Sequence, residues 1–408
     1  MFIRTQIISI LNKIFKYSFL LAVFFLPFSK ALTEIFIITT IFFWFCHRLS
    51  VGNFYGSKKY VFVIFGLFII FSSLSAFGSR YPLVSLRGIL KLLKFVQMAF
   101  ILSELSKDAR WLKWLLYTAF FSFAFIILDS LTQLFLGYDL IRGFSYQRGN
   151  YQVRLMGPFI SYGLLAAFLI ATIPLLVTFI LIQRKWIHRI VFSVFTLLSF
   201  LLLYHTHSRS AWIASIIALF AFSFLTRKRS ILIVLIAILF LAPFVFPYNS
   251  LVHLNVVNKE QSLVERFYLW DRAIQVVRAR PLFGCGINTF TRNYSKYDQT
   301  KSQLVSGYPV HNGFLQIAAE SGLVALTFFL VIIVMAIKSG WKAFSISEGN
   351  RKLWAVGLLT GLIALLCQGF ADTTFHNPQS GLLLWLFIGM LISIDQWNID
   401  DSSKSNRS

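Results

Sequence analysis

The stretch Tyr308-Pro-Val-His-Asn-Gly-Phe-Leu-Gln-Ile-Ala-Ala-Glu-Ser-Gly322 marks the point where the longest polar segment of the chain meets an apolar run. That run continues to about residue 337, long enough for a helix to cross the roughly 30 Å hydrocarbon core of a bilayer. Comparable runs recur along the chain, and they are continuous where a membrane β-barrel would alternate polar and apolar residues. The sequence therefore predicts an all-α polytopic membrane protein.

Composition agrees with this class, because 57% of the 408 residues are hydrophobic and only 13% are charged. A soluble globular protein averages roughly 25% charged residues. We expect about twelve transmembrane helices from the lengths of the apolar runs. These runs lie near 15–29, 31–46, 60–77, 85–105, 112–136, 158–182, 189–205, 209–226, 230–247, 313–337, 353–371 and 378–395.

The net charge of +23 is explained first by membrane topology. Lys and Arg collect in alternate loops, and such loops face the cytoplasm, so both termini are expected on the cytoplasmic side. A nucleic-acid partner is not indicated. The first apolar run follows Arg4, Lys13 and Lys16 as in a signal peptide, but no small-residue cleavage site comes after it. We expect it to be a retained first helix.

Four segments follow from this topology: helices one to nine in 1–247, an outer loop in 248–312, helices ten to twelve in 313–396, and a cytoplasmic tail in 397–408. Within the outer loop, residues 262–280 predict an amphipathic helix that ends at Pro281. Its expected apolar stripe is Val264, Phe267, Trp270 or Asp271, Ile274 and Val277. The loop carries an excess of cations on the outer side, which suggests an anionic ligand there.

His311 is the first candidate for chemistry, because an imidazole titrates near neutral pH and acts as a general acid or base. Its alternative role is that of a polar residue at a helix start. Glu320 lies about two and a half turns further along. It is expected either to orient His311 or to pack the helix.

Cations supply the other candidates. Arg209 opens the eighth apolar run, where it either snorkels to the interface or binds phosphate with its bidentate guanidinium. Arg87, Lys91 and Lys94 share one face of the fourth run. They line a path for phosphate, snorkel to the interface, or pair with acids elsewhere in the chain.

Cofactors and metals are not expected. Cys46, Cys285 and Cys367 have neither disulfide-framework nor metal-ligand spacing, and the histidines on the outer side show no zinc signature. No P-loop or dinucleotide fingerprint occurs in the chain.

Several of these residues fall into motifs that resemble those of the O-antigen ligase and O-antigen polymerase superfamily. The resemblance covers roughly residues 150–395, and departures occur at Ser210 and at Met156-Gly-Pro-Phe-Ile160. The matching motifs are Thr206-x-Ser208-Arg209-x-Ala211-Trp212, Arg266-x-x-x-Trp270-x-x-Ala273, Pro281-x-x-Gly284-x-Gly286 with Phe290, and His311-Asn312-x-x-Leu315 with Glu320-x-Gly322.

The resemblance implies a metal-independent, inverting glycan transfer at the periplasmic face of the bacterial inner membrane. The implied donor is a polysaccharide on undecaprenyl pyrophosphate, and the acceptor of a ligase is a sugar hydroxyl of the lipid A core. It implies catalytic roles for His311 as base and for Arg209 and Arg266 as cations. Substrate-binding roles are expected at Ser208, Trp270, Arg87, Lys91, Asn312 and Glu320.

Other functions remain open at this stage. An O-antigen polymerase would use the same donor but extend a second lipid-linked chain. A protein O-oligosaccharyltransferase is a further alternative. A transporter of lipid-linked glycan would place ionisable groups near midspan and often shows duplicated halves, and no internal repeat is evident here.

Overall fold

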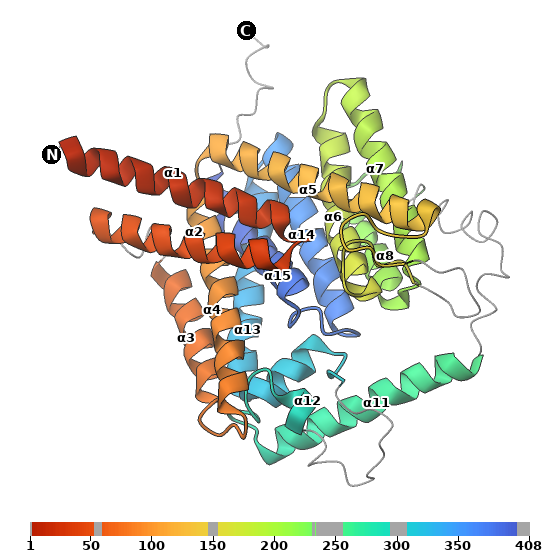
Figure 1. The fold of residues 1–408 in the computed structure, drawn as a ribbon. Coiled ribbons are helices and arrows are strands. Elements are labelled where there is room, and N and C mark those ends of the chain that lie inside the picture. Colours follow the sequence, from red (N-terminus) through yellow and green to blue (C-terminus); the bar gives the residue numbers. More distant parts are fainter. Residues whose placement is uncertain are drawn as a thin grey trace.

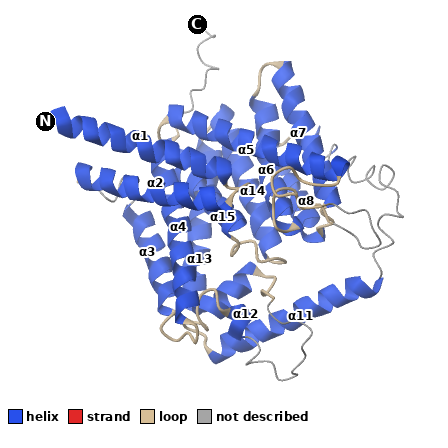
Figure 2. Cartoon of the chain, in the orientation of Figure 1, coloured by secondary structure: helices blue, strands red, loops and turns tan. Residues whose placement is uncertain are grey.

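The computed structural model describes residues 2–52, 59–145, 154–230, 233, 256–293 and 308–397, and their regular structure is helical (Figures 1 and 2). The helices are α1 (Phe2–Phe25), α2 (Lys30–Val51), α3 (Lys59–Leu74), α4 (Pro82–Leu105), α5 (Ala109–Leu136), α6 (Tyr162–Ile182), α7 (Trp186–His205), α8 (Arg209–Thr226), α11 (Val256–Ala279), α12 (Phe290–Asn293), α13 (Gly313–Ile346), α14 (Gly349–Gly369), α15 (Pro378–Ser393) and the 3₁₀ turn η3 (Ile394–Gln396).

The predicted spans overlap these helices, although α1 begins well before residue 15 and α13 continues past residue 337. The run near 230–247 lies almost entirely outside the described residues. Among the described residues, 8 helices are long and apolar enough to cross a membrane, and α3 and α15 are shorter apolar helices. Helix α4 is less apolar because it carries Arg87, Lys91, Lys94 and Glu104. The expected all-α polytopic membrane architecture is confirmed.

Polar residues between the apolar runs set the helix boundaries. Ser29 begins α2 by accepting the N–H of Leu32 at 3.3 Å, and Asp108 begins α5 by accepting the N–H of Arg110 at 3.1 Å. Gly52 and Gly137 end these two helices with φ of 75° and 89°, a left-handed conformation that glycine adopts at little cost. Local sequence therefore explains where these helices start and stop.

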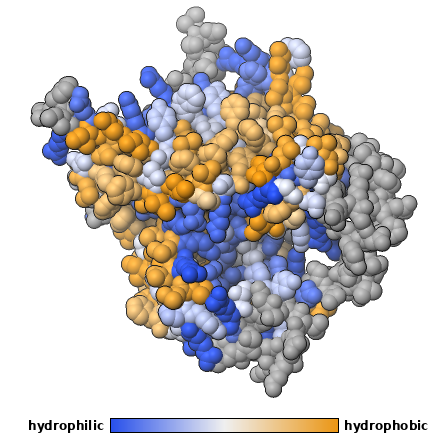
Figure 3. Space-filling view, in the orientation of Figure 1, coloured by the Kyte–Doolittle hydropathy of each residue, from blue (hydrophilic) through white to orange (hydrophobic). Residues whose placement is uncertain are grey.

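The centre of the bundle is formed by α14 and α15, whose Leu362, Phe387 and Leu391 are fully buried. Hydrophobic residues cover the outward faces of α1, α2 and α5, and hydrophilic residues gather around the loop that joins α14 to α15 (Figure 3). Phe42 on α2, for example, is 59% exposed. Apolar faces of this extent are typical of lipid contact.

Helix α13 is broken at Gly322, whose backbone is non-helical with φ 84° and ψ 170°. The break leaves the carbonyls of Ala319 and Glu320 without partners in their own helix. Amides from within the outer loop replace those partners: Cys285 N–H donates to Ala319 O at 2.9 Å, and Gly286 N–H to Glu320 O at 2.9 Å. The two glycine motifs, Pro281–Gly286 and Glu320–Gly322, are thus one docking unit, defined here as the α13 break.

Glycine is required at the α13 break for space as well as for backbone conformation. A Cβ on Gly284 would lie 2.5 Å from the carbonyl carbon of Glu320, and one on Gly322 would overlap the carbonyl of Leu282. We predict that Gly322→Ala destabilises the protein by about 3 kcal/mol, because it combines a glycine-only backbone conformation with overpacking. Thermal unfolding in detergent measures this, with Gly66→Ala as control because a Cβ there has nothing within 4 Å.

Helix α11 includes the predicted amphipathic helix but begins earlier, at Val256, and only Trp270 and Val277 of its predicted apolar stripe pack against the buried cluster. Val264 and Phe267 are 65% and 62% exposed, whereas Leu269, Ala273 and Val276 are buried. These three pack with Cys285, Phe290, Val310 and Ala319. Apolar residues occupy both sides of α11, so periodicity alone does not decide which side meets the protein.

Candidate functional site

His311 lies directly before α13, in a left-handed backbone conformation with φ 54°. Its Nδ1 lies 3.5 Å from Asp372 Oδ1, and its side chain is 29% exposed. The following residue, Asn312, caps α13 by accepting the N–H of Leu315 at 3.0 Å. The structure therefore places an accessible imidazole beside a carboxylate at the mouth of the bundle.

Asp372 comes from the loop between α14 and α15, and it did not appear among the predicted site residues. Its carbonyl accepts the N–H of Gly313 at 3.1 Å, which ties the loop to the start of α13. A Cβ on Gly163 would lie 2.7 Å from Asp372 Oδ2, so the carboxylate packs on the first turn of α6. The available signal was an acidic residue at the outer end of an apolar run.

Glu320 does not orient His311. It is buried at the α13 break, where its carboxylate accepts the N–H of Asn288 at 2.7 Å and of Phe290 at 3.1 Å. Gln316 Nε2 donates to it at 3.2 Å. Of the two expected roles, the structure supports packing: Glu320 fixes the loop segment 286–290 on α13.

Lys91 belongs to the same buried group as Glu320. Its Nζ donates to His376 O at 2.8 Å and lies 3.4 Å from Asn288 Oδ1. Burial, and then the Lys91 ammonium, lower the pKa of His376 to about 3, so its 3.6 Å contact with Glu320 involves a neutral imidazole. Lys91, Asn288 and His376 line a cavity of about 50 Å³ between α3, α4, α13 and α15.

The three cations predicted on one face of α4 have different surroundings. Lys94 pairs with Glu34 of α2 at 3.4 Å, which is the alternative of pairing with an acid elsewhere. Lys91 is held as described above, and Arg87 is exposed. The structure therefore does not present them as one continuous row.

Arg209 is the first residue of α8 and is exposed, and its side chain makes no ion pair or hydrogen bond with the described residues. Ser208 precedes it and is buried, but its side chain does not cap the helix; its Oγ lies 3.4 Å from Ser210 Oγ. A cation at an uncapped helix N-terminus opposes the helix dipole. This arrangement is unfavourable by itself and becomes favourable when an anion binds between the guanidinium and the free amides.

Arg266 and Trp270 lie on one flank of α11, next to its buried face. Trp270 packs against the cluster that contains Val310, the residue before His311. Its indole Nε1 is buried without a hydrogen-bond partner, and Arg266 has no partner among the described residues. Packing of α11 on α13 thus brings this flank toward His311.

Two other kinds of chemistry find little support in the described residues. Burial, and then Glu320, raise the pKa of the Cys285 thiol to about 12, so it is not an activated nucleophile. The described parts of the chain hold no group of three His, Cys, Asp or Glu side chains arranged as metal ligands.

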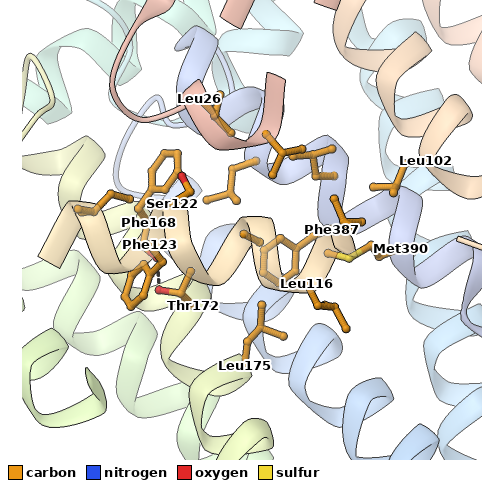
Figure 4. Close-up of a pocket in the computed structure, with 16 residues that line it drawn as sticks. Leu26, Leu102, Leu116, Ser122, Phe123, Phe168, Thr172, Leu175, Phe387 and Met390 are labelled. Atoms are coloured by element: carbon orange, nitrogen blue, oxygen red, sulfur yellow. Dashed lines mark hydrogen bonds between the residues drawn. The ribbon is translucent and has the colours of Figure 1, made fainter. Parts of the chain in front are cut away.

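A separate cavity of about 90 Å³ lies among α1, α4, α5, α6 and α15 (Figure 4). Its lining is almost entirely apolar. The two hydroxyl groups in it are used within the bundle: Ser122 donates to Phe24 O at 2.8 Å and Thr172 to Phe168 O at 2.7 Å. This cavity offers no acid, base or cation and is distinct from the His311 site.

The comparison with known families supports the motifs identified in the sequence. The family described as O-antigen ligase matches residues 194–330, a range that contains Arg209, α11 and His311. Residues 194–330 are therefore similar to the O-antigen ligase family. The chain is also similar to the exopolysaccharide production protein ExoQ of Rhizobium meliloti (strain 1021), at 24% identity over 148 residues.

That alignment covers 34% of this chain and 33% of ExoQ, so the matched part spans about a third of the relative. Both comparisons match only a part of the chain, and the membrane-spanning helices described above lie inside and outside that part. Asp372 lies outside the matched residues 194–330.

Proposed function

We propose that the protein is an O-antigen ligase of the bacterial inner membrane. It transfers a polysaccharide from undecaprenyl pyrophosphate to a sugar hydroxyl of the lipid A core. In this proposal both termini and the 397–408 tail are cytoplasmic, helices one to nine occupy 1–247, and helices ten to twelve occupy 313–396. The outer loop 248–312 then lies in the periplasm and carries half of the site.

The observation that carries the proposal is the His311–Asp372 pair at the mouth of the bundle. With the proton on Nδ1 facing Asp372, the Nε2 atom is free to accept a proton. A carboxylate in this position fixes the imidazole tautomer and stabilises the imidazolium that forms. The 3.5 Å separation is longer than a hydrogen bond, as is common in catalytic pairs without substrate.

In the proposed reaction His311 Nε2 takes the proton of the acceptor hydroxyl while the oxygen of that hydroxyl attacks the anomeric carbon of the donor glycan. The bond between that carbon and the phosphate oxygen breaks, and undecaprenyl pyrophosphate leaves with the electron pair. A single displacement inverts the anomeric configuration. The donor already contains its activated bond, so no nucleotide cofactor is required.

Arg209 and Arg266 stabilise the charge that develops on the leaving pyrophosphate. Arg209 is supported in this role by its place at the uncapped start of α8, and Arg266 by the packing of α11 on α13. Two guanidinium groups supply the neutralisation for which other transferases use a metal ion. Trp270, Ser208 and Arg87 are proposed substrate contacts, whereas Lys91, Asn312 and Glu320 hold the site in place.

A polymerase is the second candidate, because ExoQ is described as an exopolysaccharide production protein. The two candidates share the donor and the proposed base and differ in the acceptor. A polymerase adds the donor glycan to a second lipid-linked chain, so its loss leaves single repeat units on the lipid A core.

Lipopolysaccharide gels of a deletion strain complemented with wild type or His311→Ala test the proposal. For a ligase, we expect the null strain to make core without long chains while carrier-linked polymer accumulates, and His311→Ala to fail to restore the ladder at normal expression. Single repeat units on the core would identify the polymerase. A normal ladder in the null strain would contradict both functions.

A further inference from the structure

A third arginine, Arg154, lies close to the same site and has no role in the mechanism above. Its guanidinium lies 4.3 Å from the centre of the Tyr162 ring. The side chain is half-buried and has no carboxylate partner among the described residues. A partly buried cation without a counter-ion is costly, so its retention calls for a ligand.

The backbone around Arg154 is held firmly. Leu155 N–H donates to His205 O at 3.0 Å, which fixes this segment to the last turn of α7, four residues before Arg209. Gln133 Oε1 accepts the N–H of Gly157 at 2.8 Å. Arg154 is therefore presented beside the Arg209 turn by a segment anchored on both α5 and α7.

The position of Arg154 also connects the Arg209 turn to the His311–Asp372 pair. Tyr162, which carries the stacked guanidinium, is the first residue of α6, and its neighbour Gly163 packs against the Asp372 carboxylate. On the other side, burial and then Arg154 lower the pKa of His207, so this histidine adds no further positive charge. Arg154 is thus near the Arg209 turn and contacts the first turn of α6, on which Asp372 packs.

We propose that Arg154 binds the diphosphate of the lipid-linked donor, as a third guanidinium beside Arg209. The assignment rests on the proposed function. Stacking on Tyr162 holds the planar group in one orientation, which suits bidentate binding of phosphate oxygens. The N-terminus of α6 adds a favourable dipole at the same point. Cations placed close together repel one another, and a diphosphate removes that repulsion.

Direct binding of undecaprenyl pyrophosphate without glycan, to the full chain in detergent, tests this assignment. Arg154→Gln is expected to weaken binding about 10-fold or more, since it removes a charge-assisted contact to phosphate. Arg154→Lys is expected to weaken it less, because charge remains but the bidentate geometry is lost. Arg278→Ala, which removes an exposed arginine of α11, is the matched control and is expected to leave the Kd unchanged.

Undecaprenyl monophosphate has the same lipid chain but only one phosphate, so it distinguishes binding of the diphosphate from binding of the lipid. Its affinity is expected to fall less in Arg154→Gln than the affinity for the pyrophosphate. Equal losses for both lipids would overturn the assignment, as would wild-type affinity for the pyrophosphate in Arg154→Gln. If Arg154→Gln does not fold, wild-type affinity in Arg154→Lys would overturn it.

This binding experiment does not depend on transfer. A wild-type protein that binds the pyrophosphate but transfers no glycan would remove the proposed ligase and leave the role of Arg154 intact. If the wild type transfers glycan but Arg154→Gln binds the pyrophosphate with wild-type affinity, the proposed ligase is retained and the role of Arg154 is removed.

Discussion

Replacing His311 with alanine is expected to reduce kcat for glycan transfer by about 10²–10⁴-fold, the usual contribution of a general base. The donor should still bind, because the proposed phosphate contacts come from α8, α11 and the Arg154 segment. The measurement is turnover of lipid-linked glycan by purified protein in detergent. Such a protein separates no compartments, so turnover there also excludes a pure transporter.

Two further variants make the His311 result specific. Asp372→Asn keeps the shape of the side chain but removes the charge that faces Nδ1, and a smaller loss in kcat of about 10-fold is expected. His188→Ala removes an exposed histidine on α7 that contacts Gln183, and it should retain full turnover. Unaltered kcat in His311→Ala would rule out the base assignment.

Helix positions were predictable from the sequence because membrane helices depend on length and hydrophobicity, which are local properties. The capping residues Ser29 and Asp108 then fix the boundaries within the same few residues. The buried side of α11 was not predictable in this way. Its contacts with Val310 and Ala319 depend on the break in α13, and that break depends on amides from another part of the chain.

The candidate site shows the same division between local and distant information. His311, Arg209 and Arg266 stood out because charged or titratable residues next to apolar runs need a reason to be there. His311 lies before the N-terminus of α13 and Asp372 lies after the C-terminus of α14. Their spacing along the chain does not reveal that the two side chains are partners. Glu320 was predicted to bind substrate, but its carboxylate accepts hydrogen bonds from two backbone amides, and such partners leave no mark in a sequence.

The α13 break explains how α11 and the start of α13 are held in fixed positions relative to one another. It fixes the loop segment 281–290 against α13, and α11, which ends at Ala279, enters this segment directly. Arg266 on α11 and His311 at the start of α13 are therefore positioned by one shared structure. A glycine substitution there is expected to disturb both groups, even though no glycine touches substrate.

Arg209→Ala is expected to lower kcat by about 10²–10³-fold, comparable to the loss of one transition-state charge contact. Arg209→Lys should restore part of this, because lysine supplies charge without the bidentate fork. Arg209→Ala is expected to leave thermal stability unchanged or slightly higher. A cation at an uncapped helix N-terminus costs about 0.3–1 kcal/mol, and alanine removes that cost.

Arg227 provides the matched control, because it caps the other end of α8. There a cation is favourable to the helix dipole, so Arg227→Gln is expected to lower stability slightly and to leave kcat unchanged. If Arg209→Ala lowers activity but raises stability, the Arg209 charge is unfavourable for folding and serves substrate binding or turnover. A parallel loss of both would instead assign Arg209 to the structure of the turn and contradict its catalytic role.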